Sequence, residues 1–405
     1  MKIRINRTSI VKYASALYFL FIFLNDHTIY SDFFEQTGTI FLVAATFFLI
    51  TSALVAGKLY SNGKMWLIFV GWAVCVLLPC IISGFRTLVI IRFCYWITLL
   101  LMLLVLETVS IDYRESLLIT VKILCVWCFV CYFYTMLGLD FLPVTNVSDK
   151  LLYNWYKVEL NGYLIYKNLV EFSMGAFSLI KLYSPLGEPG IASMYFNFAV
   201  IWLLFFTDLS DKRNTRWIAA FSAAVVLSLS LMGVLVLIAT FVVYMIQKRK
   251  FGAIILLSIP AVVLCVVMIL QKLGSESYSQ RSNDYVVMFE AIAGSLPFGI
   301  GLGNIDLVHT ASQNRELQGF YCGLLYPLMQ FGIFGLYYYF MMVIAAKYFS
   351  DNHYGRYAFF IYFIMTLLTQ PQADECFILS FIFAGVIHSC RYGKRRSSFR
   401  KPYEA

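Results

Sequence analysis

The sequence predicts an all-α polytopic membrane protein with about twelve transmembrane helices. Of its 405 residues, 61% are hydrophobic and 13% are charged, whereas soluble domains contain about 25% charged residues. The mean hydropathy is +0.77. Apolar stretches of membrane-spanning length recur along the chain, and a helix needs about twenty such residues to cross a bilayer. Together these observations exclude an ordinary soluble domain.

Five spans are predicted in the first third of the chain, at 10–24, 38–56, 65–83, 88–106 and 117–137. Lys2, Arg4 and Arg7 precede the first span, as basic residues do in a secretory signal peptide. No small-residue cleavage site precedes Asn25, so we expect this segment to remain as the first membrane helix.

Seven further spans follow a long polar interval, at 190–207, 217–230, 232–246, 251–270, 321–346, 357–370 and 376–390. The second and third of these form one apolar run, which is too long for one ordinary helix and short for two. Ser228, Ser230 and Gly233 interrupt the run and predict a tight reversal between two short helices.

Positive charge predicts the orientation of these spans. With an even number of spans and both termini in the cytoplasm, most lysines and arginines fall on the cytoplasmic side, as the positive-inside rule requires. The net charge of +9 is explained in this way, and no separate basic domain indicates nucleic-acid binding. The expected organisation is helices at 1–137, an external loop at 138–189, helices at 190–270, an external loop at 271–320, helices at 321–390 and a basic tail at 391–405.

Both external loops are expected to contain short helices. In the first loop, aromatic and apolar residues between Gly162 and Leu182 recur at helical spacing and could lie in the membrane interface. In the second, Val286, Val287, Phe289 and Ile292 have helical periodicity. The glycines of the run 297–303 then allow a close backbone approach, either to a ligand or to a neighbouring helix.

Cys125, Cys128 and Cys131 are spaced three residues apart and would share one face of a helix. Because no histidine or carboxylate is close to them in sequence, packing within a membrane helix is favoured over metal binding. The sequence contains no cluster with metal-ligand spacing.

The candidate functional residues belong to the external side. Glu188 precedes Pro189 at the start of a span, where it is either a helix cap or a rigidly held carboxylate. Arg281 is an external cation that could bind a phosphate, or a solvated charge on a polar loop. His309 is a candidate acid, base or sugar-binding group. Candidate substrate-binding residues are Arg86, Arg92, Lys181, Asp284, Asn314 and Arg315.

Arg92 has a separate argument, because it lies within an apolar run, where a charge is costly and therefore indicates function. The many tyrosines and tryptophans of the external loops could pack on sugar rings, but an interfacial aromatic belt is their ordinary interpretation.

Four stretches resemble bacterial O-antigen polymerases of the Wzy type, within the O-antigen polymerase and ligase superfamily. They are S-P-L-G-E-P-G at 184–190, L-S-L-S-L-M-G at 227–233, R-S-N-D-Y followed by S-L-P-F-G-I-G-L-G at 281–303, and Q-F-G-I-F-G-L at 330–336. Two positions depart from the family pattern. Lys181 stands where an arginine is common, and His309 is farther from the G-x-x-G than is usual, with Tyr321 nearer the expected place.

The resemblance implies a GT-C-like helical fold in the bacterial inner membrane and an inverting, metal-independent glycosyltransferase without a cofactor. Its substrates would be oligosaccharides linked to undecaprenyl pyrophosphate, as both donor and acceptor, within the lipid bilayer. A chain-length regulator and a flippase are candidate protein partners. Glu188, His309 and Arg281 would be catalytic at the periplasmic face, and the six substrate-binding candidates would hold the pyrophosphate and the glycan.

Two alternative functions remain open from the sequence. One is the sister reaction, ligation of a glycan to a lipid A core. The other is a flippase or transporter of lipid-linked sugars, which would require charged residues lining a path among the helices.

Overall fold

The computed structural model describes residues 6–25, 37–143, 158–161, 164–168, 171–174, 177–182, 185, 189–252, 254, 263, 266–270, 273, 276–304, 308, 322–348, 352–369 and 375–392. Its helices in the first third are α1 (Arg7–Leu24), α3 (Thr37–Ala56), α4 (Gly63–Ile82), α5 (Thr87–Thr108) and α6 (Tyr113–Met136). The later helices are α8 (Pro189–Phe206), α9 (Lys212–Leu227), α10 (Leu231–Gln247), α12 (Glu276–Ser295), α14 (Tyr326–Phe331), the 3-10 helix η1 (Gly332–Gly335), α15 (Leu336–Tyr348), α16 (His353–Thr369) and α17 (Cys376–Tyr392).

The described residues contain seven helical stretches that are long and apolar enough to cross a membrane, and the last of them, Tyr326–Ala346, includes α14, η1 and most of α15. The helices α10 and α17 are shorter and apolar. This confirms an α-helical membrane protein. The predicted spans overlap described helices, with two exceptions: 251–270 lies mostly outside the described residues, and 321–346 is divided between α14, η1 and α15. The predicted reversal is also confirmed, because α9 ends at Leu227 and α10 begins at Leu231, with Leu229 at φ +51° between them.

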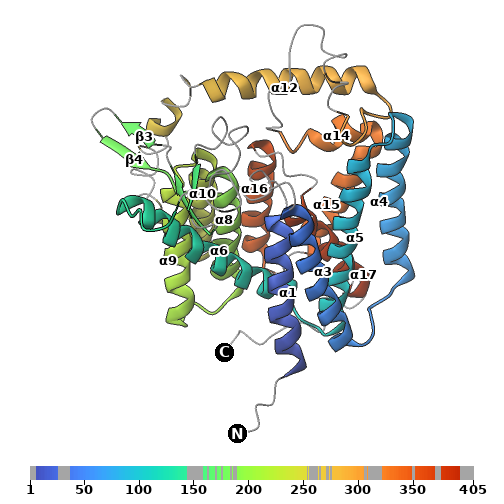
Figure 1. Ribbon diagram of the computed structural model, residues 1–405, viewed down its shortest axis with the longest axis horizontal. Coiled ribbons are helices and arrows are strands. Elements are labelled where there is room, and N and C mark those ends of the chain that lie inside the picture. The colour runs from blue at the N-terminus through green and yellow to red at the C-terminus, as the bar shows by residue number, and fades with distance from the viewer. Residues whose placement is uncertain are drawn as a thin grey trace.

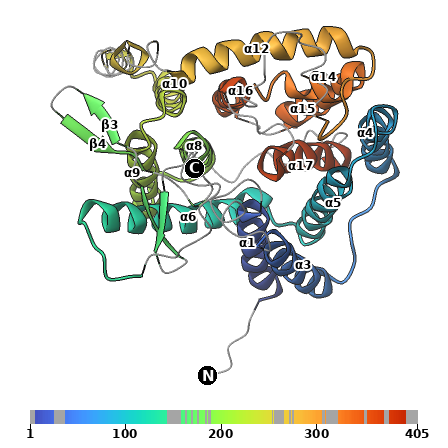
Figure 2. The ribbon, with the colours of Figure 1, turned by 45° about the horizontal axis from the view of Figure 1, so that its top comes forward.

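The helix α8 lies at the centre of the bundle. Of the residues of α8, 83% are buried, whereas 17% of those in the apolar part of α3 (Thr39–Ala56) are. The exposed apolar side chains of α3 suit contact with lipid. Figure 2 shows α8 surrounded by α6, α9, α10, α16 and α17. The helix α8 is therefore largely screened from the surrounding bilayer.

One end of the bundle is rich in positive charge, and we call it the basic end. Here Lys12 pairs with Glu115 at 2.5 Å, and Arg391 pairs with Glu107 at 2.7 Å, joining the start of α1 to α6 and the end of α17 to α5. The Asn352 amide donates to the carbonyl of Phe205, joining the start of α16 to the end of α8. The basic side chains of this end are Arg7, Lys12, Lys58, Lys64, Arg114, Lys212, Arg213, Arg216, Lys248, Arg249, Lys250, Arg356 and Arg391.

The helix α12 lies across the opposite end of the bundle (Figure 1). We call this end the α12 end. The helical periodicity predicted for the second external loop is confirmed, since α12 contains all the residues that carried it. Its twenty residues lie over the ends of the bundle because its mixed polar and apolar composition does not suit burial within it.

The expected short helix in the first external loop is wrong. Its described residues form two antiparallel hairpins, in which β1 (Val158–Asn161) pairs with β2 (Ile165–Asn168), and β3 (Glu171–Met174) pairs with β4 (Phe177–Ile180). The sequence is rich in tyrosine, phenylalanine and isoleucine, which favour strands. Burial then selects the period of two, because Tyr166 of β2 is buried and the Trp127 indole of α6 donates to the Leu164 carbonyl at 2.7 Å.

The three cysteines of α6 lie on its buried face, as the spacing predicted. The span predicted at 321–346 is interrupted, because α14 ends at Phe331 and α15 begins only after η1. Gly332 and Gly335 allow this break, because a Cβ built on them would lie 2.0 Å from the Pro297 oxygen and 2.2 Å from the Pro327 oxygen.

Candidate functional site

The helix α12 is attached to the bundle by one apolar face. Val287, Met288 and Ala291 are buried on it, against Ile300 and Met329 below. These positions share a face because residues three and four apart are neighbours on a helix. At the other flank, the Tyr285 hydroxyl donates to the carbonyl of Leu368 in α16. The underside of α12 is thus fixed to both α14 and α16.

Asp284 is the buried carboxylate of α12, with 1% of its surface exposed. It precedes Val287 and Met288 by three and four residues, which places it on the same attached face. Arg281 lies one turn earlier in α12, where the structure describes its backbone but not its side chain. A buried carboxylate is costly unless it is partnered, so its position indicates a specific role.

The glycine run is a close contact between two backbones. Gly299, Gly301 and Gly303 have φ of +75°, +77° and +80°, a region that residues with a Cβ rarely adopt. The Ile300 and Gly301 amides donate to the carbonyls of Met329 and Gln330, at 3.0 and 2.8 Å. Of the two alternatives that the sequence left open, the structure shows the approach to a neighbouring element.

Gly332 completes this contact from the other side. Its φ is +57°, and a Cβ built on it would lie 2.0 Å from the carbonyl oxygen of Pro297. The Ile333 amide donates to that same oxygen at 2.9 Å. At the break between α14 and α15, the chain is therefore in direct backbone contact with the glycine run.

The α4–α5 turn is joined to the same run. The Asn304 amide donates to the carbonyls of Ser83 and Gly84, both at 3.1 Å, and the Ser83 hydroxyl donates to the Gly299 carbonyl at 3.0 Å. Arg86 follows this turn at the N-cap of α5 and is exposed. Arg92 is only 8% exposed and lies about 9 Å further along α5, at 1.5 Å per residue.

A small polar cavity opens at the α12 end between α8, α10 and α16. The space open to the centre of a water molecule is about 10 Å³. The Asn197 amide nitrogen donates to the Gly233 carbonyl at 2.9 Å, and the Ser193 hydroxyl donates to the Gly190 carbonyl at 2.7 Å. The lining residues are Gly190, Ser193, Met194, Asn197, Ser230, Met232, Gly233, Val236, Met365, Thr366 and Thr369.

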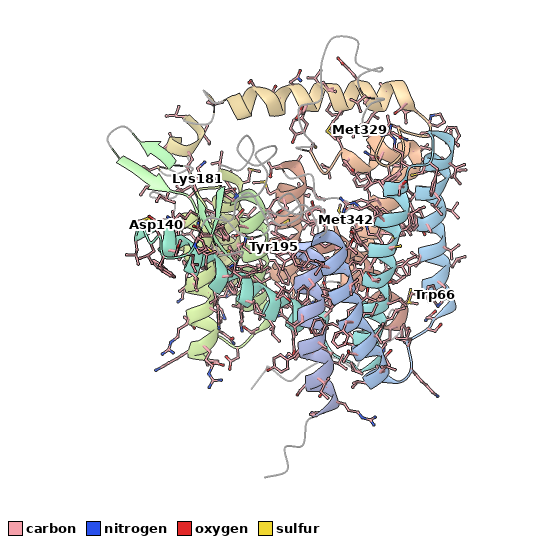
Figure 3. All side chains as sticks on the ribbon, in the orientation of Figure 1. Trp66, Asp140, Lys181, Tyr195, Met329 and Met342 are labelled. Atoms are coloured by element: carbon pink, nitrogen blue, oxygen red, sulfur yellow. The ribbon has the colours of Figure 1, made fainter. Side chains whose placement is uncertain are left out.

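Two of the candidate cations lie on opposite flanks of the α12 end. Lys181 follows β4, and its neighbour Leu182 donates its amide to the carbonyl of Leu227 at the end of α9. Arg86 begins α5, which both views place on the other flank, with α8 and α16 between (Figures 1 and 2). In Figure 3, Lys181 and Met329 mark the two flanks and Tyr195 of α8 lies between them. Lys181 and Arg86 therefore do not form one binding pocket.

The remaining candidates Glu188, His309, Asn314 and Arg315 lie outside the described residues. Among those described, Asp284 and Arg281 lie three residues apart on α12, and Arg86 directly follows the α4–α5 turn that Asn304 contacts.

Several buried polar residues at this end were not predicted from the sequence. Ser193 and Asn197 are 2% exposed and lie four residues apart on α8. That spacing within an apolar run was the signal that could have identified them. Glu375, just before α17, is 4% exposed and was also missed. A buried carboxylate beside a span could have been noticed by the same reasoning as for Arg92.

Comparison with known protein families, with curated proteins and with solved structures finds no match to this chain. Its function is therefore argued from the arrangement of its own residues.

Proposed function

We propose that this protein is an O-antigen polymerase of the Wzy type. It transfers a growing glycan from undecaprenyl pyrophosphate onto a hydroxyl of a second lipid-linked repeat unit. In this proposal the fold is GT-C-like with twelve spans, both termini are cytoplasmic, and the α12 end faces the periplasm across the bacterial inner membrane. The observation that carries the proposal is α12, which covers the end of the bundle opposite to the basic end and holds Asp284 buried against it.

The substrate chemistry fits this location. A polyprenyl lipid keeps its chain in the bilayer and its diphosphate and sugars at the surface, so the reaction has to occur at an end of the bundle. The α12 end combines a covering helix, a buried carboxylate and a polar cavity on the central helix α8. A covering helix can also exclude water, which would otherwise compete as acceptor.

The proposed chemistry makes modest demands on the protein. Pyrophosphate leaves readily once its charge is neutralised, and Arg281, with Arg86 and Arg315, are the candidates for that role. Positioning the acceptor hydroxyl supplies much of the remaining acceleration. The base would be Glu188 or His309.

The basic end supports the orientation. Thirteen described basic side chains gather there, and the positive-inside rule assigns such an end to the cytoplasm. The α12 end is then periplasmic, where lipid-linked repeat units would be polymerised.

The test is reconstitution of the purified full-length protein in lipid nanodiscs with undecaprenyl-pyrophosphate-linked repeat units. The wild type should produce a ladder of lengthening glycans. Arg281→Ala should slow the reaction by about 10²–10³-fold, the usual cost of removing one group that stabilises charge in the transition state. Arg216→Ala, at the basic end, is the matched control and should retain wild-type activity.

Other outcomes decide against the proposal. Transfer of glycan only to a lipid A core acceptor would show a ligase. Movement of intact lipid-linked units between leaflets without bond formation would show a transporter. A full ladder from Arg281→Ala would remove the role of Arg281.

A further inference from the structure

The cavity between α8, α10 and α16 contains a buried acceptor that the fold leaves unused. Asn197 is 2% exposed, and its Oδ1 receives no hydrogen bond within the described part of the chain. The orientation of this amide is fixed by its partner, because the Gly233 carbonyl can only accept. The nitrogen must therefore face Gly233, and the oxygen must be the atom left over. Leaving such an atom buried without a partner is unfavourable, because the hydrogen bond it would make to water is lost and not replaced.

The cavity exists because α10 has no side chain at its closest approach to α8. A Cβ on Gly233 would lie 2.4 Å from Cβ and 2.5 Å from Oγ of Ser193. Ser230 caps α10, and its Oγ accepts from the Gly233 amide at 3.3 Å. Polar groups of two helix starts thus surround a space that a larger residue would fill.

The size and polarity of the cavity restrict what can enter. Its volume accommodates one water-sized group, so a sugar ring, a phosphate or a lipid chain is excluded. Asn197 Oδ1 requires a donor, and the described residues that line the cavity include no charged side chain. The fitting group is a single O–H, either of a water molecule or of a sugar whose ring lies outside at the α12 end.

We propose that this cavity is a subsite for one hydroxyl group of a bound saccharide, which donates a hydrogen bond to Asn197 Oδ1. This deepens the proposed function and rests on it for the identity of the ligand. The site lies at the first turns of the central helix α8 and is close in sequence to the E-P-G stretch. The subsite anchors a sugar and takes no part in proton transfer, because the Asn197 amide neither gains nor loses a proton at ordinary pH.

The binding experiment uses the full-length protein in detergent and follows unfolding temperature by tryptophan fluorescence. The probes are the methyl glycosides of glucose, galactose, mannose, N-acetylglucosamine and rhamnose, and glycerol serves as a polyol without a ring. Polyols stabilise proteins generally by exclusion from the surface. Specific binding is distinguished because it saturates and depends on Asn197.

For the wild type we expect a saturable rise in unfolding temperature with at least one glycoside and none with glycerol. Asn197→Leu, which keeps the branched shape and the number of side-chain heavy atoms, should abolish the saturable part. Ser193→Ala is a milder change, because the backbone contacts of α8 stay intact. It should raise the half-saturating concentration about three- to tenfold, as loss of one hydrogen-bonding group does. Thr207→Val, just beyond the other end of α8, should leave binding unchanged.

A wild type that no glycoside stabilises saturably would show a water site only and overturn the proposal. Equal glycoside binding by wild type, Asn197→Leu and Ser193→Ala would overturn it as well. Asn197-dependent binding by a protein that makes no glycan ladder would retain the subsite while the polymerase proposal fails. A glycan ladder with binding that does not depend on Asn197 would retain the polymerase and reject the subsite.

Discussion

Single glycines decide how the α12 end is built. Gly332 has φ +57° and its α-hydrogen faces the Pro297 carbonyl, so neither the dihedral nor the space admits a side chain. Gly57 has φ +79° but has nothing within 4 Å of a built Cβ. The pair separates the cost of the backbone conformation from the cost of the close contact.

Gly332→Ala should therefore destabilise the protein by about 2–5 kcal/mol, the sum of a left-handed backbone and an overpacked contact. Gly57→Ala should cost only the first part, about 1–2 kcal/mol. Thermal unfolding in detergent measures the difference. Equal losses in the two variants would show that the glycine run does not press on the α14–η1 segment.

Asp112 links residue chemistry to pH. Burial raises the pKa of its carboxyl, but the Arg114 side chain donates to both carboxylate oxygens, at 2.6–3.0 Å, and the net pKa is lowered. A group with a lowered folded-state pKa stabilises the protein above its unfolded pKa of about 3.9, and this stability is lost as pH falls through the folded value.

The unfolding temperature should consequently decrease as pH is lowered from about 5 to below 3.9. Asp112→Asn should reduce that pH dependence while lowering stability at neutral pH. Glu115→Gln, at the exposed pair with Lys12, serves as the comparison. If Asp112→Asn follows the same pH curve as the wild type, the pairing with Arg114 is not what stabilises the start of α6.

At the scale of elements, the arrangement depends on where each helix ends and on how closely neighbouring helices pack. Apolar length determines the helices of the bundle. The segment 158–180 forms hairpins instead, and Tyr166 of β2 is buried against α6. The contact of α8 with α10 depends on the single position Gly233. Adding a side chain at Gly233 and removing the one at Ser193 tests this contact.

Gly233→Ala should destabilise the helix pair by about 1–3 kcal/mol, because its Cβ meets Ser193. Ser193→Gly alone should cost about 1 kcal/mol through helix propensity. Combined, the two changes should cost less than their sum, since Ser193→Gly removes the atoms that the Cβ added by Gly233→Ala would meet. Additive losses in chemical unfolding would show that the two residues do not touch.

At the scale of the whole molecule, the two ends differ in charge and in covering. The basic end is joined by ion pairs between helix ends, and the α12 end by hydrogen bonds to backbone carbonyls. By the positive-inside rule, this difference in charge predicts the orientation of the protein in the membrane.

Cysteines introduced one at a time into a parent protein whose ten native cysteines are replaced by serine test that orientation. Ser282→Cys lies in the exposed part of α12, and Ser210→Cys lies in the exposed α8–α9 turn. A membrane-impermeant maleimide should label Ser282→Cys in intact spheroplasts and Ser210→Cys only after permeabilisation, with the parent protein as background. Labelling of both from one side would show that the ends do not face different compartments. The reverse pattern would invert the protein and reject a periplasmic site.

The sequence by itself determined the class of protein, the position of most of its described apolar helices and the helicity of α12, because apolar length and periodicity are local properties of the chain. It also identified the glycine run, but not what the run approaches. Only the tertiary structure decided that Gly332 supports that run, that Lys181 and Arg86 lie on opposite flanks, and that Asn197 borders a cavity. Each of these depends on contacts between segments far apart in sequence, and a residue's own neighbours carry no record of them.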